Sequence, residues 1–267
     1  MTDNRSVQIG RYEVIGVLGE GATGVVYRAR AGSDVVAVKV LRVSEPVARR
    51  RFEREARIAG EAASRHLVPI LEVGDGFIVM PLYPRGSLAD AIRRDGPLRL
   101  PAVVRVAAEL AQALDALHGR EIVHRDVKPS NVMLGDDGAA LADFGLARGA
   151  NSTQLTRDGQ LVGSAHYLAP ELIEGRPASP ASDIYALGCL LYECVTGAPP
   201  FTGRVEAQLG YAHLVDLPPD PRTHRADLPD EVAAALLAAL EKDAQARPTS
   251  ATALARMLHL ASRPAPA

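Results

Sequence analysis

The sequence has no tryptophan and only two cysteines, Cys189 and Cys194, among its 267 residues. Two cysteines cannot build a disulfide framework, and their spacing is not that of a metal-binding pair, so we expect both to pack in the core of a protein from a reducing compartment. No apolar run approaches the ~20 residues that cross a bilayer, and the polar N-terminus carries no signal-peptide pattern. We therefore expect no membrane contact in this segment and a cytoplasmic location.

Positive charge is not in excess, and lysine is scarce. The net charge is −2, from 30 basic and 32 acidic residues, which gives no reason to expect nucleic acid or an anionic membrane as a partner. Only Lys39, Lys128 and Lys242 are lysines. Because arginine supplies the other positive charges, each lysine marks a position where a guanidinium group does not serve. The composition, 47% hydrophobic and 23% charged, is that of one globular domain or of two that share a cleft.

Strand patterns dominate the N-terminal part of the chain. Short β-branched runs bounded by glycines predict two hairpins and a strand between them. Residues 49–63 instead carry apolar residues at helical spacing, which predicts one helix. The predicted strands are 12–18, 25–30, 35–41, 68–72 and 77–82, with residues 73–76 as the turn between the last two.

Helical patterns take over from residue 83. Ser87, followed by Asp90 three residues later, predicts a capped helix start, and Pro101 stands at the tolerated first turn of a long amphipathic helix. We expect an α+β fold with a strand-rich unit over 1–82, a helical unit over 83–262 and a tail or linker start at 263–267. The predicted helices are 88–94, 101–118, 181–196, 205–215, 230–240 and 251–261, with short strands at 132–134 and 140–142.

A glycine-rich turn joins the first two predicted strands. Gly19, Gly21 and Gly24 form a G-x-G-x-x-G pattern, in which backbone N–H groups can approach phosphate oxygens closely. The same pattern also suits a flexible hairpin turn. A dinucleotide-binding oxidoreductase would need a helix to begin at the third glycine, whereas residues 25–27 are β-branched and aromatic and predict a strand, so that class is disfavoured.

Three polar groups outside the glycine turn carry chemistry. Lys39 alternates with valines on the third strand, and its compact ammonium suits contact with two phosphate oxygens. The segment 124–131 contains a candidate base, Asp126, a cation, Lys128, and a neutral oxygen ligand, Asn131. Asp143 follows an apolar pair. Asn131 and Asp143 together offer the hard oxygens that Mg²⁺ prefers.

These motifs, in this order, resemble the signature set of the eukaryotic-like Ser/Thr protein kinases, and most closely their bacterial members. Further matches lie at residues 163–171 (GSAHYLAPE), 183–188 (DIYALG) and 247–249 (RPT), so that the resemblance covers about residues 9–260. It implies a bilobal protein-kinase fold. A small antiparallel-sheet lobe with one helix would stand over a larger, mostly helical lobe, with ATP between them.

The resemblance also implies roles for individual residues. Asp126 would orient the acceptor hydroxyl and take its proton, and Lys128 would stabilise the moving phosphoryl group. Lys39 would contact the α- and β-phosphates and pair with Glu55, for which Glu53 is the alternative. The Mg²⁺ ligands would be Asn131 and Asp143, with Mn²⁺ as a substitute metal. The implied ATP contacts are Leu18, Gly19, Gly21, Gly24, Val26, Ala37, Lys39, Met80, Tyr83, Met133 and Ala142.

Other implied roles concern regulation and support. Pro81 departs from the acidic residue common at its position and removes one backbone N–H. Arg125 would bind a phosphate on the activation loop, whose candidate acceptors are Thr156, Thr153 and Ser152; the alternative is that these hydroxyls only solvate the loop. Ser164 would be a structural hydroxyl of the substrate-positioning loop. The supporting residues would be Glu171 paired with Arg247, and Asp183 beneath the catalytic loop.

The sequence thus predicts an ATP-dependent Ser/Thr protein kinase regulated by autophosphorylation, with Ser/Thr-bearing protein substrates and self-association for phosphorylation in trans. A pseudokinase scaffold is the alternative, although the lysine, base and metal aspartate that it usually lacks are all present. A small-molecule phosphotransferase would lack the 163–171 segment. Bacterial relatives often continue into a membrane span and a sensor domain, so the chain is expected either as a cytoplasmic kinase or as the cytoplasmic part of a membrane-anchored one.

Overall fold

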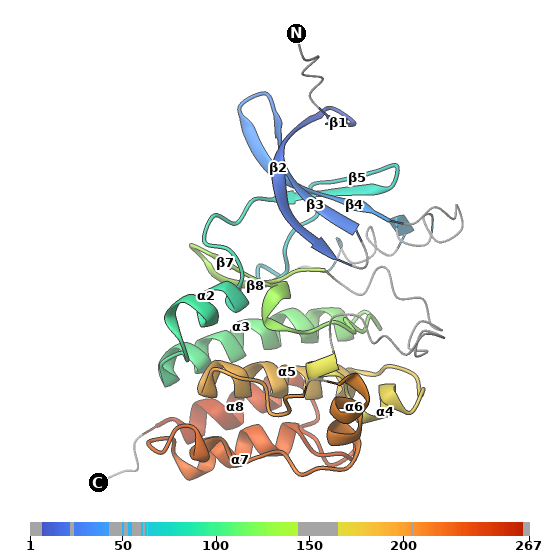
Figure 1. The fold of residues 1–267 in the computed structure, drawn as a ribbon. Helices are drawn as coiled ribbons and strands as arrows, with labels where there is room; N and C mark the ends of the chain where they lie inside the picture. Colours follow the sequence, from blue (N-terminus) through green and yellow to red (C-terminus); the bar gives the residue numbers. More distant parts are fainter. Residues whose placement is uncertain are drawn as a thin grey trace.

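The computed structural model describes residues 7–21, 24–42, 64–143, 165–203 and 205–263, with residues 50, 53, 54, 60 and 62 in addition. A twisted sheet at the N-terminal end stands over a helical body, as Figure 1 shows. The helix predicted over 49–63 lies almost wholly outside the described residues. Among the described helices, none is long and apolar enough to cross a bilayer.

Six antiparallel strands form the N-terminal sheet in the order β1-β2-β3-β4-β6-β5. Alternation along β4 separates two faces. Val36 and Val38 pack with Tyr12, Ala29 and Val79 in a small cluster, whereas Lys39 belongs to the other face, as predicted. The strands are β1 (Gln8–Ile9), β2 (Tyr12–Gly21), β3 (Gly24–Ala31), β4 (Asp34–Leu41), β5 (Glu72–Gly74) and β6 (Phe77–Pro81).

The prediction of a strand over 68–72 was wrong for most of its length. β5 begins only at Glu72, because the backbone at the start of the predicted strand pairs elsewhere, although the N–H of Leu71 still donates to the Val79 carbonyl of β6 at 2.8 Å. The N–H of Val68 donates to the carbonyl of Leu141 at 2.9 Å, and Leu67 forms a parallel bridge with the same residue. The segment before β5 therefore ties the sheet to the helical part, a long-range pairing that a local apolar run does not reveal.

The helices of the C-terminal part lie close to the ranges that the sequence predicted. Ser87 and Asp90 cap α2 reciprocally: the N–H of Asp90 donates to Ser87 Oγ at 3.2 Å, and the N–H of Ser87 donates to Asp90 Oδ2 at 2.9 Å. The longer helices are α2 (Leu88–Asp95), α3 (Leu100–His118), α5 (Pro180–Thr196), α6 (Glu206–Leu214), α7 (Asp230–Ala239) and α8 (Ala251–Ala261). The shorter elements are α4 (Pro170–Ile173), η1 (Pro129–Asn131), η2 (Ala165–Tyr167), η3 (Pro221–Thr223), β7 (Val132–Gly135) and β8 (Gly138–Leu141).

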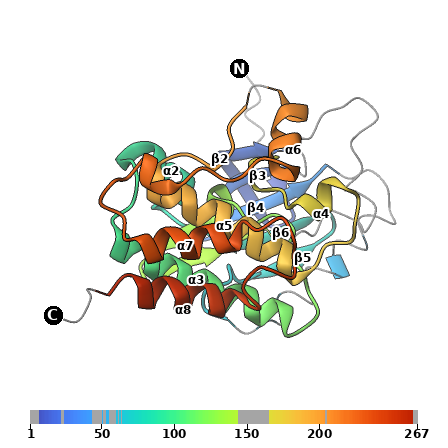
Figure 2. The ribbon, with the colours of Figure 1, turned by 90° about the horizontal axis from the view of Figure 1, so that it is seen from below.

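One apolar core joins the sheet to the helices. Ala37, Ile78 and Met80 from the sheet share a cluster with buried residues of α3, α5, α7 and α8. Seen from below, these four helices run alongside one another (Figure 2), and α5 is buried along nearly its whole length. Cys189 and Cys194 are free thiols buried in that helix, and burial raises the pKa of both, so they pack as apolar groups.

Candidate active site

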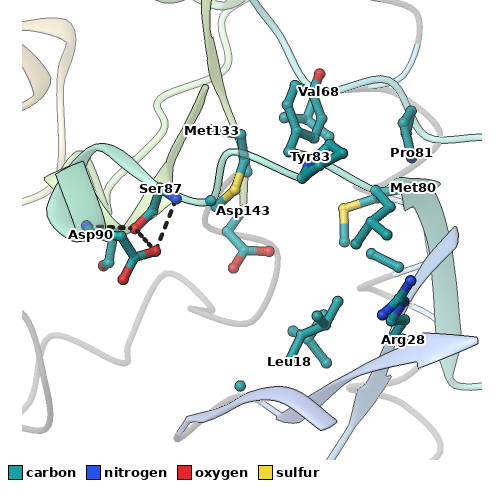
Figure 3. Close-up of a pocket in the computed structure, with 18 residues that line it drawn as sticks. Leu18, Arg28, Val68, Met80, Pro81, Tyr83, Ser87, Asp90, Met133 and Asp143 are labelled. Carbon is teal, nitrogen blue, oxygen red and sulfur yellow. Dashed lines mark hydrogen bonds between the residues drawn. The ribbon is translucent and has the colours of Figure 1, made fainter. Parts of the chain in front are cut away.

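A cavity of about 650 Å³ lies where the sheet meets the helical part (Figure 3). β2, β3 and β4 supply its roof, and β7 with the residue pair Ala142–Asp143 supplies its floor. Of the eleven predicted nucleotide contacts, these eight line it: Leu18, Gly19, Val26, Ala37, Met80, Tyr83, Met133 and Ala142.

Gly21, Gly24 and Lys39 do not line the cavity. At Gly24 the structure gives a different reason for glycine, because an added Cβ would lie 2.1 Å from the carbonyl oxygen of Val40. The missing side chain therefore permits the close pairing of β3 with β4, whatever the loop binds. At Gly21 an added Cβ would meet nothing within 4 Å.

Several polar lining residues escaped the sequence reasoning. Arg28 shares the pocket-facing side of β3 with Val26 by simple alternation, a signal that was available. Ser87 and Asp90 were predicted as a helix cap, and they also reach the cavity wall. In Figure 3 this pair lies on the side of the view opposite Arg28. The cavity rim thus carries a cation and a carboxylate in addition to its apolar lining.

The catalytic-loop candidates converge on one carboxylate. Lys128 Nζ lies 2.8 Å from Asp126 Oδ2, and Asn131 Nδ2 donates to the same oxygen at 2.9 Å and to the Asp126 carbonyl at 2.8 Å. The turn η1, which Pro129 opens with its fixed φ, brings Asn131 back beneath Asp126. Two donors therefore hold the carboxylate in one orientation.

Asp183 lies beneath this loop and is 1% exposed. Its Oδ2 accepts from the backbone N–H of His124 and lies 2.8 Å from His118 Nε2, while its Oδ1 accepts from the N–H of Arg125 at 2.8 Å. Arg125 has a φ of 67°, a left-handed conformation that disfavours side chains other than glycine. The three contacts of Asp183 hold the loop in that conformation.

His124 connects the catalytic loop to Asp143. The ring is fully buried, and burial lowers its pKa despite the nearby carboxylates of Asp183 and Asp126. The neutral ring donates from Nε2 to the carbonyl of Ala142 at 3.0 Å and accepts at Nδ1 from the N–H of Asp126 at 3.3 Å. One side chain thus fixes the backbone beside both carboxylates.

Lys39 pairs with Asp143 across 104 positions of the sequence. Its Nζ lies 2.7 Å from Asp143 Oδ1, and the lysine is only 8% exposed. Glu55, the predicted partner, lies outside the described residues. Glu53, the alternative, instead accepts a hydrogen bond from the N–H of Gly76 at 3.4 Å, so the structure directs it toward the β5–β6 turn.

Asp143 and Asn131 have the chemistry that a Mg²⁺ site needs. Mg²⁺ commonly takes one or two protein carboxylates or other hard oxygens and completes its shell with phosphate oxygens and water. The side-chain nitrogen of Asn131 donates to Asp126, so its amide oxygen points away from that carboxylate and is the atom that could bind a metal. Within the described ranges, no cluster of three or more His, Cys, Asp or Glu side chains is found.

Glu171 and Arg247 form a buried bidentate pair. Arg247 Nη1 and Nη2 lie 2.8 and 2.9 Å from the two carboxylate oxygens, and Ser182 Oγ donates to Glu171 Oε1 at 2.7 Å. Burial alone would raise the pKa of Glu171, but the hydrogen bonds from Arg247 and Ser182 outweigh it and lower the pKa. The segment that follows η2 is therefore anchored to the end of the helical part.

The regulatory candidates Ser152, Thr153, Thr156 and Ser164 lie outside the described residues, within 144–164. Just after that gap, Tyr167 Oη donates to Glu193 Oε2 at 2.5 Å. Burial raises the pKa of both groups. Glu193 on α5 is a contact of the segment after the gap that no sequence motif had indicated.

An antiparallel sheet over a helical body, with a cavity and two carboxylates between them, is the bilobal protein kinase fold, as predicted. The chain matches the Protein kinase domain family over residues 12–258. It is 38% identical over 264 residues to Serine/threonine-protein kinase PknE of Mycobacterium tuberculosis, covering 95% of this chain and 46% of that protein. It is 40% identical over 270 residues to the DNA damage-responsive serine/threonine-protein kinase RqkA of Deinococcus radiodurans, covering 95% of this chain and 40% of that protein.

A solved structure agrees with these relatives. The crystal structure of Rad53 1–466 in complex with AMP-PNP superimposes with a TM-score of 0.77 at 26% identity, over 91% of this chain and 64% of that one. The chain therefore belongs to the protein kinase domain family, among its bacterial eukaryotic-like Ser/Thr members. It spans less than half the length of these bacterial relatives.

Proposed function

We propose that this chain transfers the γ-phosphoryl group of ATP to Ser or Thr hydroxyls of protein substrates. The observation that carries the proposal is the link that the His124 ring makes between two charged groups. It bonds the backbone of Asp126, whose carboxylate Lys128 and Asn131 hold, and the backbone of Ala142, next to the paired Asp143 and Lys39. The complex of the related Rad53 structure with AMP-PNP supports ATP as the nucleotide. The names of the bacterial relatives support Ser and Thr as acceptors.

The cavity suits an adenine nucleotide by size and lining. Its volume of about 650 Å³ is within the range of small-molecule sites. The apolar roof and floor would enclose the base, and the backbone of Tyr83 would meet its edge. Pro81 has no N–H, but its carbonyl oxygen remains available as an acceptor. The adenine would lie between Leu18, Val26, Ala37, Met80, Met133 and Ala142.

The chemistry needs alignment and positive charge more than covalent help. The acceptor oxygen attacks the γ-phosphorus, the bond from that phosphorus to the bridging oxygen breaks, and ADP leaves with the electron pair. Asp126 orients the hydroxyl and receives its proton. Lys128 stabilises charge on the transferring group, and Lys39 does so on the α- and β-phosphates.

Mg²⁺ would be held by Asp143 and Asn131, and Mn²⁺ can replace it. The ion supplies positive charge beside the phosphates when bound. Its presence would also give Asp143 a second cation to contact besides Lys39, which would free the lysine to reach phosphate oxygens.

Regulation and location are further parts of the proposal. Autophosphorylation at Thr156, Thr153 or Ser152 would give Arg125 a phosphate to bind, and a new charge-assisted contact of this kind orders a loop. Phosphorylation in trans would require two copies to associate. The use of ATP and the buried free thiols support a cytoplasmic location.

The test is phosphate transfer from radiolabelled ATP to a generic acceptor protein. We expect Lys39→Met and Asp126→Asn to lower the rate by at least ~10²-fold, the usual cost of losing one preorganised electrostatic group. Arg256→Met and Asp227→Asn, at exposed positions, are the matched controls and should leave it unchanged. Mass spectrometry after incubation with MgATP would locate added phosphate; wild-type rates in the two site variants would overturn the assignment.

A further inference from the structure

Two titratable side chains, one buried and one half-buried, have no part in the proposed chemistry. His213 on α6 is 0% exposed, and Lys242, which follows α7, is half-buried. Both contact Phe201. The Lys242 Nζ lies 4.5 Å from the centre of the Phe201 ring, and the His213 ring lies 4.9 Å from it, edge to face.

This group of side chains fastens the end of α6. Lys242 Nζ donates to the carbonyl oxygens of Ala212 and His213 at 3.0 and 2.8 Å in the last turn of the helix, where the Ala212 carbonyl also accepts from the N–H of Asp216. Phe201 in turn presents its own carbonyl oxygen to His166 Nδ1 at 3.1 Å. His166 belongs to η2, so α6 reaches the segment Ala165–Tyr167 through one aromatic ring.

A second chain of contacts links His213 to Glu171, at the C-terminal end of residues 165–171. His213 Nδ1 lies 2.8 Å from Tyr185 Oη. The guanidinium of Arg247 lies 4.8 Å from the centre of the Tyr185 ring and holds Glu171 with two hydrogen bonds. His213 therefore contacts supports of both flanks of residues 165–171.

The remaining ring nitrogen of His213, Nε2, is buried. Burial, followed by the charges of Lys242 and His166, lowers the pKa of His213 to about 3, whereas the backbone of His166 acts in the opposite direction. The ring is therefore neutral near pH 7. Among the described residues, Nε2 has no completed hydrogen bond, although the His166 backbone is the polar group that influences it.

We propose that His213 is a positioning residue for the protein acceptor, holding residues 165–171 where they contact the acceptor peptide. The proposal rests on the proposed kinase function, in which this segment matches the substrate-positioning loop. His213 acts through its two nitrogens in different ways. Nδ1 secures the ring to Tyr185, and Nε2 donates to the backbone of His166 when the segment closes on an acceptor.

Two substitutions separate the nitrogens. His213→Asn keeps an amide near the Nδ1 position, and His213→Gln extends an amide toward the Nε2 position. His213→Ala removes both, and His224→Ala, at an exposed position on the same part of the chain, is the matched control. The measurements are the KM for a generic Ser/Thr acceptor protein, the KM for ATP, and the melting temperature.

We expect His213→Ala and His213→Asn to raise the acceptor KM about fivefold, the equivalent of one hydrogen bond, and to leave the ATP KM unchanged. His213→Gln should restore the acceptor KM to within about twofold of wild type. The melting temperature should rank the two amide variants the other way round. His213→Asn should lie closer to wild type than His213→Gln, because it retains the Tyr185 contact. His224→Ala should change none of the three quantities.

An acceptor KM that simply follows the loss of melting temperature, or one that is unchanged in His213→Ala, would overturn the proposal. If the alanine variant does not fold, the comparison of Asn with Gln decides the matter alone. Hydrogen exchange of the backbone amides in 165–171 tests, without catalysis, whether His213 keeps this segment in place. Faster exchange is expected in His213→Asn than in His213→Gln. Absence of any wild-type transfer would refute the kinase function, whereas unchanged exchange would refute the positioning role.

Discussion

Removal of Arg247 is expected to destabilise the helical part strongly. The side chain is 0% exposed and donates to both oxygens of Glu171. It also donates to the carbonyl oxygens of Glu241, Ala181 and Lys242, at 2.7, 2.9 and 3.1 Å. An Arg247→Met substitution keeps much of the apolar stem but leaves a buried carboxylate and three carbonyls without their donor.

The expected cost follows from that uncompensated charge. Breaking a buried ion pair by removing one partner costs about 3–5 kcal/mol, and Ser182 alone cannot replace two charge-assisted bonds. For a chain of this size, about 1 kcal/mol corresponds to roughly 2–4 °C in melting temperature. We therefore expect a loss of about 6–20 °C.

The assay is urea denaturation followed by circular dichroism, with a double variant as the critical comparison. Glu171→Met combined with Arg247→Met removes both charges, so it should lose less stability than the sum of the two single variants. The exposed pair of Arg222 with Asp220 is the control, and Arg222→Met should change stability far less than Arg247→Met. A single Arg247→Met variant within about 1 kcal/mol of wild type would refute the reasoning.

Two more predictions follow from positions with a specific structural constraint. Gly24→Ala places a Cβ 2.1 Å from the Val40 carbonyl oxygen, so β3 and β4 must separate. We expect a lower melting temperature and weaker ATP binding, measured by calorimetry. The control Gly16→Ala, whose added Cβ meets nothing within 4 Å, should change neither quantity appreciably. The pKa of His213 is lowered to about 3 by burial, so below about pH 6.5 the unfolded chain takes up a proton that the folded one does not. The free energy of unfolding should therefore fall as pH falls from 7 to 5, and the slope should be smaller in His213→Asn by up to about 1.4 kcal/mol per pH unit; an unchanged slope would contradict a buried neutral ring.

Local signals made much of the fold predictable from the sequence. The helix over 251–261 was predicted at its observed bounds, and the structure shows Ser250 capping its start. Ser87 and Asp90 revealed the start of α2, which they cap. The strand prediction failed at 68–71: Leu67 and Val68 pair with Leu141, whereas only Leu71 reaches β6, through the Val79 carbonyl. No pattern within the segment encodes the partner Leu141.

The candidate site shows the same limit. Its residue types could be recognised from motifs, since each motif is local, but the residues alone do not show which motifs touch; the pairing of Glu171 with Arg247 and the place of Asp183 were expected only from the family resemblance. Lys39 and Asp143 meet across 104 positions and His118 and Asp183 across 65, so only the packing of the sheet on the helices decides those pairs. Arg28 was missed although strand alternation places it with Val26 on the cavity side.

The geometry of the site depends on polar groups that contact no substrate. Arg125 and Asp143 both have left-handed backbones, with φ of 67° and 58°, and such residues cost about 1 kcal/mol or more each unless their surroundings hold them. Asp183 holds the first by accepting from the N–H groups of His124 and Arg125, and His124 holds the second by donating to the Ala142 carbonyl. Because a buried carboxylate and a buried imidazole are costly unless fully bonded, the backbone conformation that satisfies them is also the one that fixes Asp126 in its loop and places Asp143 in the cavity wall.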